Sequence, residues 1–277
     1  MYLAHFGLTE TPFGITPDTH FIYSGAAHQE AMNTLMLAIG SGEGFVKITG
    51  EVGTGKTLLC RRFLSLLRED PYVAAYIPNP QLDPRSLLIS VAEELGAPAT
   101  GEAVHLVKSI YQRLLELAIS GKTPVLCIDE AQTMPMLTLE SLRLLSNLET
   151  EKRKLLHIVL FGQPELDEKL AKPSARPLRQ RIAFHYRMPP LHREELSEYL
   201  EHRLRMAGYQ GKPLFSAMAR RALYRYSGGT PRLVNILAHK ALLAAFGQGA
   251  DRVGFRHVVS AARDTESAQK SRWGVVR

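Results

Sequence analysis

The 277-residue sequence is poor in cysteine and lacks any long apolar run. Its two cysteines, Cys60 and Cys127, fall in a predicted helix and a predicted central strand, which favours buried apolar roles over a structural disulfide. No stretch approaches the ~20 apolar residues that a membrane-spanning helix needs. Residues 1–6 lack a basic segment followed by an apolar one, so no secretory signal is visible. We therefore expect a cytoplasmic chain without a transmembrane segment.

Excess positive charge is absent from most of the chain. Residues 1–190 carry 19 Lys and Arg against 20 Asp and Glu, whereas residues 191–277 carry 15 against 7, a net of +8. Such an excess can indicate an anionic partner, such as nucleic acid, anionic lipid or a nucleotide. Solvated helix faces with locally paired arginines explain the same count equally well. The remaining composition, 45% hydrophobic and 22% charged, is that of an ordinary globular protein.

The chain does contain a complete G-x-x-x-x-G-K-[ST] phosphate-binding loop. In such a loop the glycines let backbone N–H groups surround the α- and β-phosphates, Lys56 reaches the β- and γ-phosphates, and Thr57 offers its hydroxyl to Mg²⁺. A β-rich run precedes the loop and a helical run follows it, so the loop opens a helix N-terminus, a favourable place for an anion. The sequence predicts nucleoside triphosphate binding. The predicted binding residues are Gly50, Glu51, Val52, Gly53, Thr54, Gly55, Lys56, Thr57 and Leu58.

Hydrophobic patterning predicts an α/β region followed by an all-helical one. Alternating strands and helices are typical of a parallel sheet, here with five strands. From the Pro189-Pro190 pair to about residue 264 only helical periodicity remains. The predicted strands are 44–49, 72–77, 124–128, 155–161 and 182–188. The predicted helices are 84–95, 104–119, 137–150, 194–206, 215–226, 231–246 and 255–262.

Two acids, Asp129 and Glu130, end the apolar strand at residues 124–128 and have the form of a Walker B element. We expect Asp129 at the end of a strand neighbouring that of the phosphate loop, holding Mg²⁺ beside Thr57. Glu130 could orient or deprotonate the attacking water, which favours a hydrolase over a kinase. The alternative is that the two acids form a helix N-cap pair.

Polar residues at other element ends are further candidates. Gln163, after the strand at 155–161, could touch the γ-phosphate or the lytic water, or simply precede the turn at Pro164. Arg179 and Arg181 precede the last strand, and one of them, Arg181 ahead of Arg179, could complete a neighbouring subunit's site; the alternative is an ordinary surface pair. Arg232 follows the expected N-cap Thr230 and Pro231, where a cation is not dipole-favoured, so a bound phosphate or plain exposure would explain it.

Taken together, these motifs resemble the AAA+ ATPases. Phe6-Gly7-Leu8, Pro12-Phe13, Thr16-Pro17-Asp18, Phe21-Ile22-Tyr23, His28, Glu30-Ala31, Gly162-Gln163-Pro164-Glu165-Leu166 and Pro231-Arg232-Leu233-Val234-Asn235 further resemble the ExeA/GspA family of secretion and pilus ATPases. Within that family, Gly42-Glu43-Gly44-Phe45 and the phosphate loop are most similar to the ATPases encoded with mannose-sensitive haemagglutinin (MSHA) type IV pilus genes.

The resemblance implies an oligomeric ATPase that binds ATP and Mg²⁺ between an α/β domain and a helical lid. Arg232 would be sensor 2, and Arg181 or Arg179 the finger in trans. Four segments are expected: 1–40, which wraps the nucleotide and contains the first helix; 41–190, the P-loop α/β domain; 191–265, the helical lid; and 266–277, a polar tail. The implied partners are further copies of the chain and inner-membrane assembly proteins of a type IV pilus or type II secretion complex.

Other functions stay open on the sequence. The sequence stops without the transmembrane helix and peptidoglycan-binding domain of longer ExeA proteins, so any membrane role would run through a partner or the basic tail at Trp273. A frayed, disordered end explains that tail more readily. A DNA-bound ATPase of the transposition-regulator or initiator kind would suit the +8 region, although no winged-helix or helix-turn-helix module follows the lid. An ATP-dependent binding switch with negligible turnover is the third alternative.

Overall fold

The computed structural model describes residues 1–150 and 153–268. It separates into two units. The helical unit comprises residues 1–25, 53–55 and 189–277, and the α/β unit comprises residues 26–52 and 56–188. The four expected segments divide the chain differently and remain predictions, and the residues around Trp273 lie outside the described part of the chain.

The α/β unit is built on a sheet that contains five strands among the described residues. Neighbouring strands pair in parallel, in the order β2-β3-β4-β1-β5. The five-stranded parallel sheet predicted from patterning is therefore confirmed. Its strands are β1 (Phe45–Gly50), β2 (Tyr72–Ile77), β3 (Thr123–Ile128), β4 (His157–Gly162) and β5 (Phe184–Met188).

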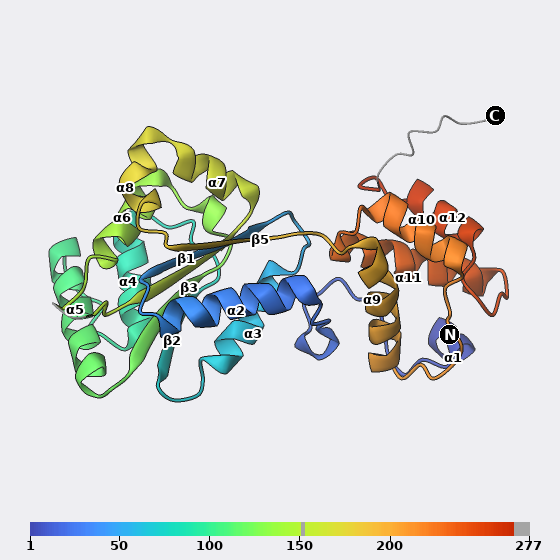
Figure 1. Ribbon diagram of the computed structural model, residues 1–277, viewed down its shortest axis with the longest axis horizontal. Coiled ribbons are helices and arrows are strands. Elements are labelled where there is room, and N and C mark those ends of the chain that lie inside the picture. The colour runs from blue at the N-terminus through green and yellow to red at the C-terminus, as the bar shows by residue number, and fades with distance from the viewer. Residues whose placement is uncertain (151–152, 269–277) are drawn as a thin grey trace. The chain divides into compact units, whose positions relative to one another are not determined.

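Helices cover both faces of this sheet, which is why its central strands are apolar almost throughout. One face packs Val46, Ile48 and Phe161 against α2 (Ala26–Gly40) and α3 (Lys56–Leu66), and both cysteines are buried in this core without a disulfide. In Figure 1, α2 and α3 lie on one side of the sheet and α7 and α8 on the other. The other face packs against α4 (Pro84–Leu95), α5 (Ala103–Ile119), α6 (Met136–Leu145), α7 (Pro164–Ala171) and α8 (Arg176–Arg179).

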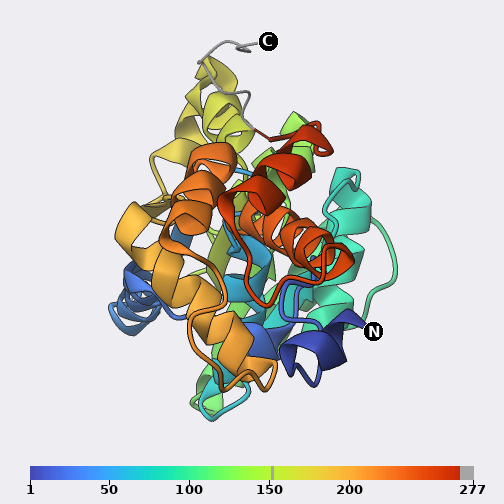
Figure 2. The ribbon, with the colours of Figure 1, turned by 90° about the vertical axis from the view of Figure 1, so that its right-hand side faces the viewer.

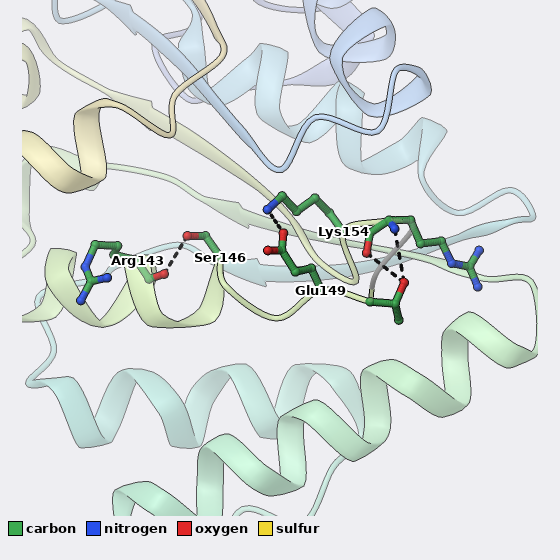
Figure 3. A network of polar contacts seen from close by, with 6 residues as sticks. Arg143, Ser146, Glu149 and Lys154 are labelled. Carbon is green, nitrogen blue, oxygen red and sulfur yellow. Dashed lines mark hydrogen bonds and ion pairs between the residues drawn. The ribbon is translucent and has the colours of Figure 1, made fainter.

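The predicted helix at 137–150 is too long. The structure has α6 at Met136–Leu145, after which the hydroxyl of Ser146 donates a hydrogen bond to the carbonyl of Arg143 at 2.7 Å. Glu149 then forms an antiparallel bridge and an ion pair with Lys154 (Figure 3). The backbone N–H of Thr150 donates to the carbonyl of Arg153 at 2.9 Å. A local hairpin-like pairing thus satisfies the backbone groups that a longer helix would have used.

The helical unit confirms the helical periodicity predicted after residue 190. Its apolar core includes Leu200, Leu223 and Leu237, and its helices run from orange to red in Figure 2. Strong local signals set two of the starts: His192 and Glu195 form a capping box, and the hydroxyl of Ser216 accepts from the N–H of Ala219 at 3.1 Å. The helices are α9 (Arg193–Met206), α10 (Ala217–Ser227), α11 (Pro231–Gly247) and α12 (Phe255–Arg263).

The N-terminal segment belongs to the helical unit and is held there by buried polar side chains. The segment contains α1 (Tyr2–Phe6) and a 3₁₀ turn, η1 (Thr19–Phe21). The Nε of Arg203 donates to the carbonyl of Pro12 at 2.6 Å, and its guanidinium lies 4.7 Å from the ring centre of Phe21. Asn235 donates to the carbonyl of Gly14 at 3.1 Å and accepts from the hydroxyl of Tyr199 at 2.7 Å. Asn235, part of the run Pro231-Arg232-Leu233-Val234-Asn235, therefore has a structural role.

Candidate functional site

The phosphate loop lies where the sequence places it, between the end of β1 and the start of α3. Gly53 and Gly55 have φ values of 83° and 99°, in the left-handed region where a side chain would be strained. Gly50 is the last residue of β1, and Lys56 is the first residue of α3, with Thr57 and Leu58 in its first turn. The N-terminus of an eleven-residue helix thus follows the loop, which suits an anion.

Lys56 is buried within this loop. Its Nζ donates to the carbonyl oxygens of Gly50 at 2.7 Å and Glu51 at 2.9 Å. Burial lowers the pKa of the Lys56 ammonium, and the negative charges of Glu130 and Asp129 partly offset that effect. The Lys56 ammonium therefore contacts two carbonyl oxygens of the loop and also experiences the negative charges of Glu130 and Asp129, with which it has no direct hydrogen bond.

Asp129 follows β3 and is almost fully buried, 3% exposed. Burial raises the pKa of its carboxyl, opposed by a 2.9 Å hydrogen bond from the N–H of Glu130 and by a hydrogen bond from the side chain of Thr57. Thr57 and Asp129 thus meet, although the expected strand adjacency is wrong: β4 lies between β3 and β1. The two side chains meet because Thr57 lies in the first turn of α3, beyond the strand ends. Their contact does not require β1 to pair with β3.

Glu130 stands in an unusual backbone conformation at the end of β3. Its φ of 51° makes it the one non-glycine residue with positive φ among residues 1–150 and 153–268. It occupies the N-cap position of the 3₁₀ turn η2 (Ala131–Thr133), but its side chain makes no capping hydrogen bond. The carboxylate instead accepts from the side-chain amide of Gln163 at 3.1 Å. The structure thus brings Glu130 and Gln163 together, and the N-cap alternative does not explain the orientation of the carboxylate.

Sequence reasoning missed Gln132, which joins these two residues. Its amide nitrogen donates to Oε2 of Glu130 at 2.6 Å, and its amide oxygen accepts from the backbone N–H of Gln163 at 3.0 Å. The available signal was a long amide side chain two residues after the second acid, at the same strand end. The hydrogen bonds themselves depend on β4 lying beside β3, which periodicity does not reveal.

No candidate arginine side chain contacts Glu130, Gln132 or Gln163, but the backbone N–H of Arg232 donates to the carbonyl of Gly53 in the phosphate loop at 3.2 Å. Arg179 ends α8 and is exposed, while Arg181 is partly exposed, and neither guanidinium forms a hydrogen bond or ion pair with another described residue. The charge of Arg181 contributes, behind the contact with Lys154, to a lowered pKa of Glu149. Arg232 is the exposed second residue of α11, with Thr230 at the N-cap position and Pro231 at the first helical position, as predicted, although the Thr230 side chain makes no capping hydrogen bond.

Residues 39–170 match the AAA domain family. Together with the parallel sheet and the phosphate loop, this match shows that the chain has the α/β fold of P-loop AAA+ proteins.

The chain is 42% identical over 255 residues to General secretion pathway protein A of Aeromonas hydrophila, and the match covers 91% of this chain and 46% of the relative. It thus spans about half the length of the curated relative that it matches. The identity extends over both the α/β residues and the helical residues. This similarity supports the resemblance to the ExeA/GspA family.

Several solved structures share the fold of this chain at low sequence identity. Cdc6p from Pyrobaculum aerophilum has a TM-score of 0.66 at 17% identity, over 89% of this chain and 70% of that one. The ORC2 protein of Aeropyrum pernix has a TM-score of 0.63 at 17% identity, over 92% and 73%. The Thermotoga maritima RuvB Holliday junction branch migration motor has a TM-score of 0.59 at 18% identity, over 92% and 73%. Such likenesses show the α/β P-loop fold alone.

The described residues contain neither a candidate membrane-spanning helix nor a cluster of metal-binding side chains. No helix within 1–150 and 153–268 is both long and apolar enough to cross a bilayer. Across the same residues, no group of three or more His, Cys, Asp or Glu side chains could hold a metal ion.

Proposed function

We propose that the ATPase hydrolyses ATP at residues 50–57, with Glu130 as the carboxylate that orients and deprotonates the attacking water. The observation that carries this proposal is the cluster formed by Lys56, Asp129, Glu130 and Gln163 around the ends of β3 and β4. Lys56 would bind the β- and γ-phosphates, and the loop N–H groups would hold the α- and β-phosphates. The amide of Gln163 lies beside the carboxylate, where it could also reach the γ-phosphate.

The residues present fit a magnesium ion. Thr57 and Asp129 supply a hydroxyl and a carboxylate that already contact each other, which is the donor set that this hard cation prefers. When bound, Mg²⁺ would neutralise phosphate charge during transfer. Asp129 is buried and turned toward Thr57, so it would help to bind the metal, while Glu130 would orient the attacking water.

Arginines would complete the site. We assign Arg232 as sensor 2 in cis, supported by its position in the first turn of α11, where a bound phosphate would be a suitable counter-charge. We assign Arg181, with Arg179 second, as the finger supplied to a neighbouring copy. The support is that neither guanidinium has a hydrogen-bond or ion-pair partner among the described residues. This arrangement requires a homo-oligomer.

The cellular role that we propose is assembly or positioning of a type II secretion complex or an MSHA-like type IV pilus. The support is the 42% identity to a general secretion pathway protein and the sequence resemblance, which within that family is greatest to the pilus ATPase MshM. The chain would then act in the cytoplasm or peripherally at the inner membrane, together with inner-membrane assembly proteins. DNA-bound initiator activity is the alternative, favoured only by the +8 charge of residues 191–277.

The first test changes Glu130 to Gln. Glu130→Gln keeps the size of the side chain but removes its ability to accept a proton, so we expect hydrolysis to fall by about 10²- to 10⁴-fold, the usual contribution of a general base. Affinity for ATP should stay within about twofold. Phosphate release and fluorescent-nucleotide titration measure the two quantities. A variant that turns over at the wild-type rate removes Glu130 as the base.

The same assay separates the proposed roles when it is run against protein concentration. A rate per subunit that rises with concentration, and no longer rises in Arg181→Ala, supports a trans finger; a rise that is lost only in Arg179→Ala would assign the finger to Arg179. Salt-dependent stimulation by duplex DNA would favour the initiator alternative. Stoichiometric nucleotide retention without phosphate release at any concentration would show a binding switch.

A further inference from the structure

Gln132 connects the two polar residues at the ends of β3 and β4. It is the donor in a 2.6 Å hydrogen bond to Oε2 of Glu130, and the acceptor in a 3.0 Å hydrogen bond from the backbone N–H of Gln163. Its own amide therefore spans the distance between two strands that are neighbours in the sheet. A shorter side chain at position 132 could not make both contacts without moving the backbone.

Both glutamines hydrogen-bond to the same oxygen of the Glu130 carboxylate, so the other oxygen has no hydrogen bond from them. Oε2 accepts from the side-chain amides of both Gln132 and Gln163, at 2.6 and 3.1 Å. No described residue hydrogen-bonds to Oε1. A carboxylate anchored through one oxygen can rotate little, so its second oxygen has a defined direction in which to accept a proton from water.

The backbone around Glu130 is also fixed by several contacts. Both the N–H and the hydroxyl of Thr133 donate to the carbonyl of Glu130 at 2.9 Å. The Nζ of Lys169, on α7, donates to the carbonyls of Gln132 and Met134, the latter at 2.9 Å. These contacts hold Glu130 at its positive φ, a conformation that persists only where the surroundings determine it. These hydrogen bonds fix the turn at both of its ends, and the hydrogen bond from Gln132 fixes the Glu130 carboxylate to that turn.

We propose that Gln132 is a positioning residue for ATP hydrolysis, which holds Oε2 of Glu130 and the start of α7 in one unit so that Oε1 faces the attacking water. This proposal rests on the role of Glu130 proposed above. In this role Gln132 would act only through the Glu130 carboxylate. The competing explanation is that Gln132 merely satisfies polar groups of the turn and contributes to folding.

The test compares Gln132→Met and Gln132→Glu with wild type. Methionine keeps the length and removes the amide, while glutamate keeps an acceptor for the N–H of Gln163 but cannot donate to Glu130 as a carboxylate. We expect kcat to fall by about 10- to 100-fold in both, the range for a lost hydrogen bond to a charged group. KM for ATP should stay within about twofold. Gln81→Met is the matched control, because Gln81 is exposed and its side chain forms no hydrogen bond with another described residue.

A second background separates positioning from folding. In Glu130→Gln, single-turnover hydrolysis should not slow further when Gln132→Met is added, because the residue acts through the carboxylate that is already gone. An equal loss in both backgrounds would show a structural role and overturn the proposal. A wild-type kcat in Gln132→Met together with an inactive Glu130→Gln would overturn it while leaving the hydrolytic role of Glu130 intact. A fully active Glu130→Gln would overturn both.

Discussion

The two units bury polar side chains for different purposes. In the α/β unit, Lys56 and Asp129 are charged groups buried at strand and helix ends. Burial lowers the pKa of Lys56 and raises the pKa of Asp129, which favours the neutral form of each. In the helical unit, Tyr199, Arg203 and Asn235 satisfy one another and the carbonyls of the N-terminal segment. The first arrangement holds charge where a substrate is expected, and the second holds two parts of the chain together.

We therefore expect the buried polar groups of the two units to change the free energy of unfolding in opposite directions. A buried charge whose best partner is a ligand destabilises the ligand-free protein, because desolvation is not fully offset. A buried network whose members are all bonded stabilises the fold, and removing one member leaves the others unsatisfied. Function would therefore reduce the stability of the α/β unit, whereas the helical unit has no such conflict at its buried network.

The largest expected effect is on activity and comes from the α/β unit. Lys56→Ala removes the charge that would meet the β- and γ-phosphates, so we expect hydrolysis to fall by at least about 10²-fold and tight nucleotide binding to be lost. Phosphate release and nucleotide titration measure this. Lys108→Ala, on the exposed surface of α5, is the matched control and should behave as wild type. Retained tight binding in Lys56→Ala would contradict the assigned site.

The next effect is on the stability of the helical unit. Arg203→Met leaves the carbonyl of Pro12 without its 2.6 Å donor and removes the cation beside Phe21, so we expect a loss of about 3 kcal/mol in the free energy of unfolding. Urea titration followed by circular dichroism measures the loss, and limited proteolysis within residues 1–25 should accelerate. Arg256→Met, at an exposed position of α12, should change stability by less than about 0.5 kcal/mol. Equal effects of the two variants would remove the structural role of the network.

The smallest effect has the opposite sign. The pKa of Asp129 is raised above its ordinary value of 3.8, so between those two pKa values the folded protein binds more protons than the unfolded chain. Stability therefore falls as pH rises through that interval, and the penalty is fully present only above the raised pKa. Asp129→Asn removes the penalty, so we expect on the order of 1 kcal/mol of added stability at pH 7 without nucleotide.

That gain should shrink as the pH falls below the ordinary aspartate value, where the wild-type carboxyl is protonated in both states. Thermal melting across pH measures the gain, and Asp251→Asn, at an exposed position, is the control. The same Asp129→Asn variant should lose magnesium-dependent hydrolysis. If Asp129→Asn destabilises the protein as Arg203→Met does, the contrast between the two units is wrong.

Much of the fold was predictable because its signals are local. The five strands, the helix at 84–95 and the helices after residue 190 follow from hydrophobic period and from nearby Gly and Pro residues. The helix predicted at 137–150 failed because Glu149 and Lys154 pair across a turn, and that contact competes with helical propensity. The candidate site was predicted as separate motifs, and its residues remain assigned by proposal.

By itself, the sequence determined the phosphate loop, the two acids after a buried strand and the concentration of positive charge after residue 190. Each of these depends on residue types at fixed short spacings, which chain connectivity preserves. Only the tertiary structure decided that β4 lies between β3 and β1, and therefore that Gln132 and Gln163 meet at the carboxylate of Glu130. Strand order is set by packing and backbone pairing between segments far apart in the chain, so no local pattern contains it.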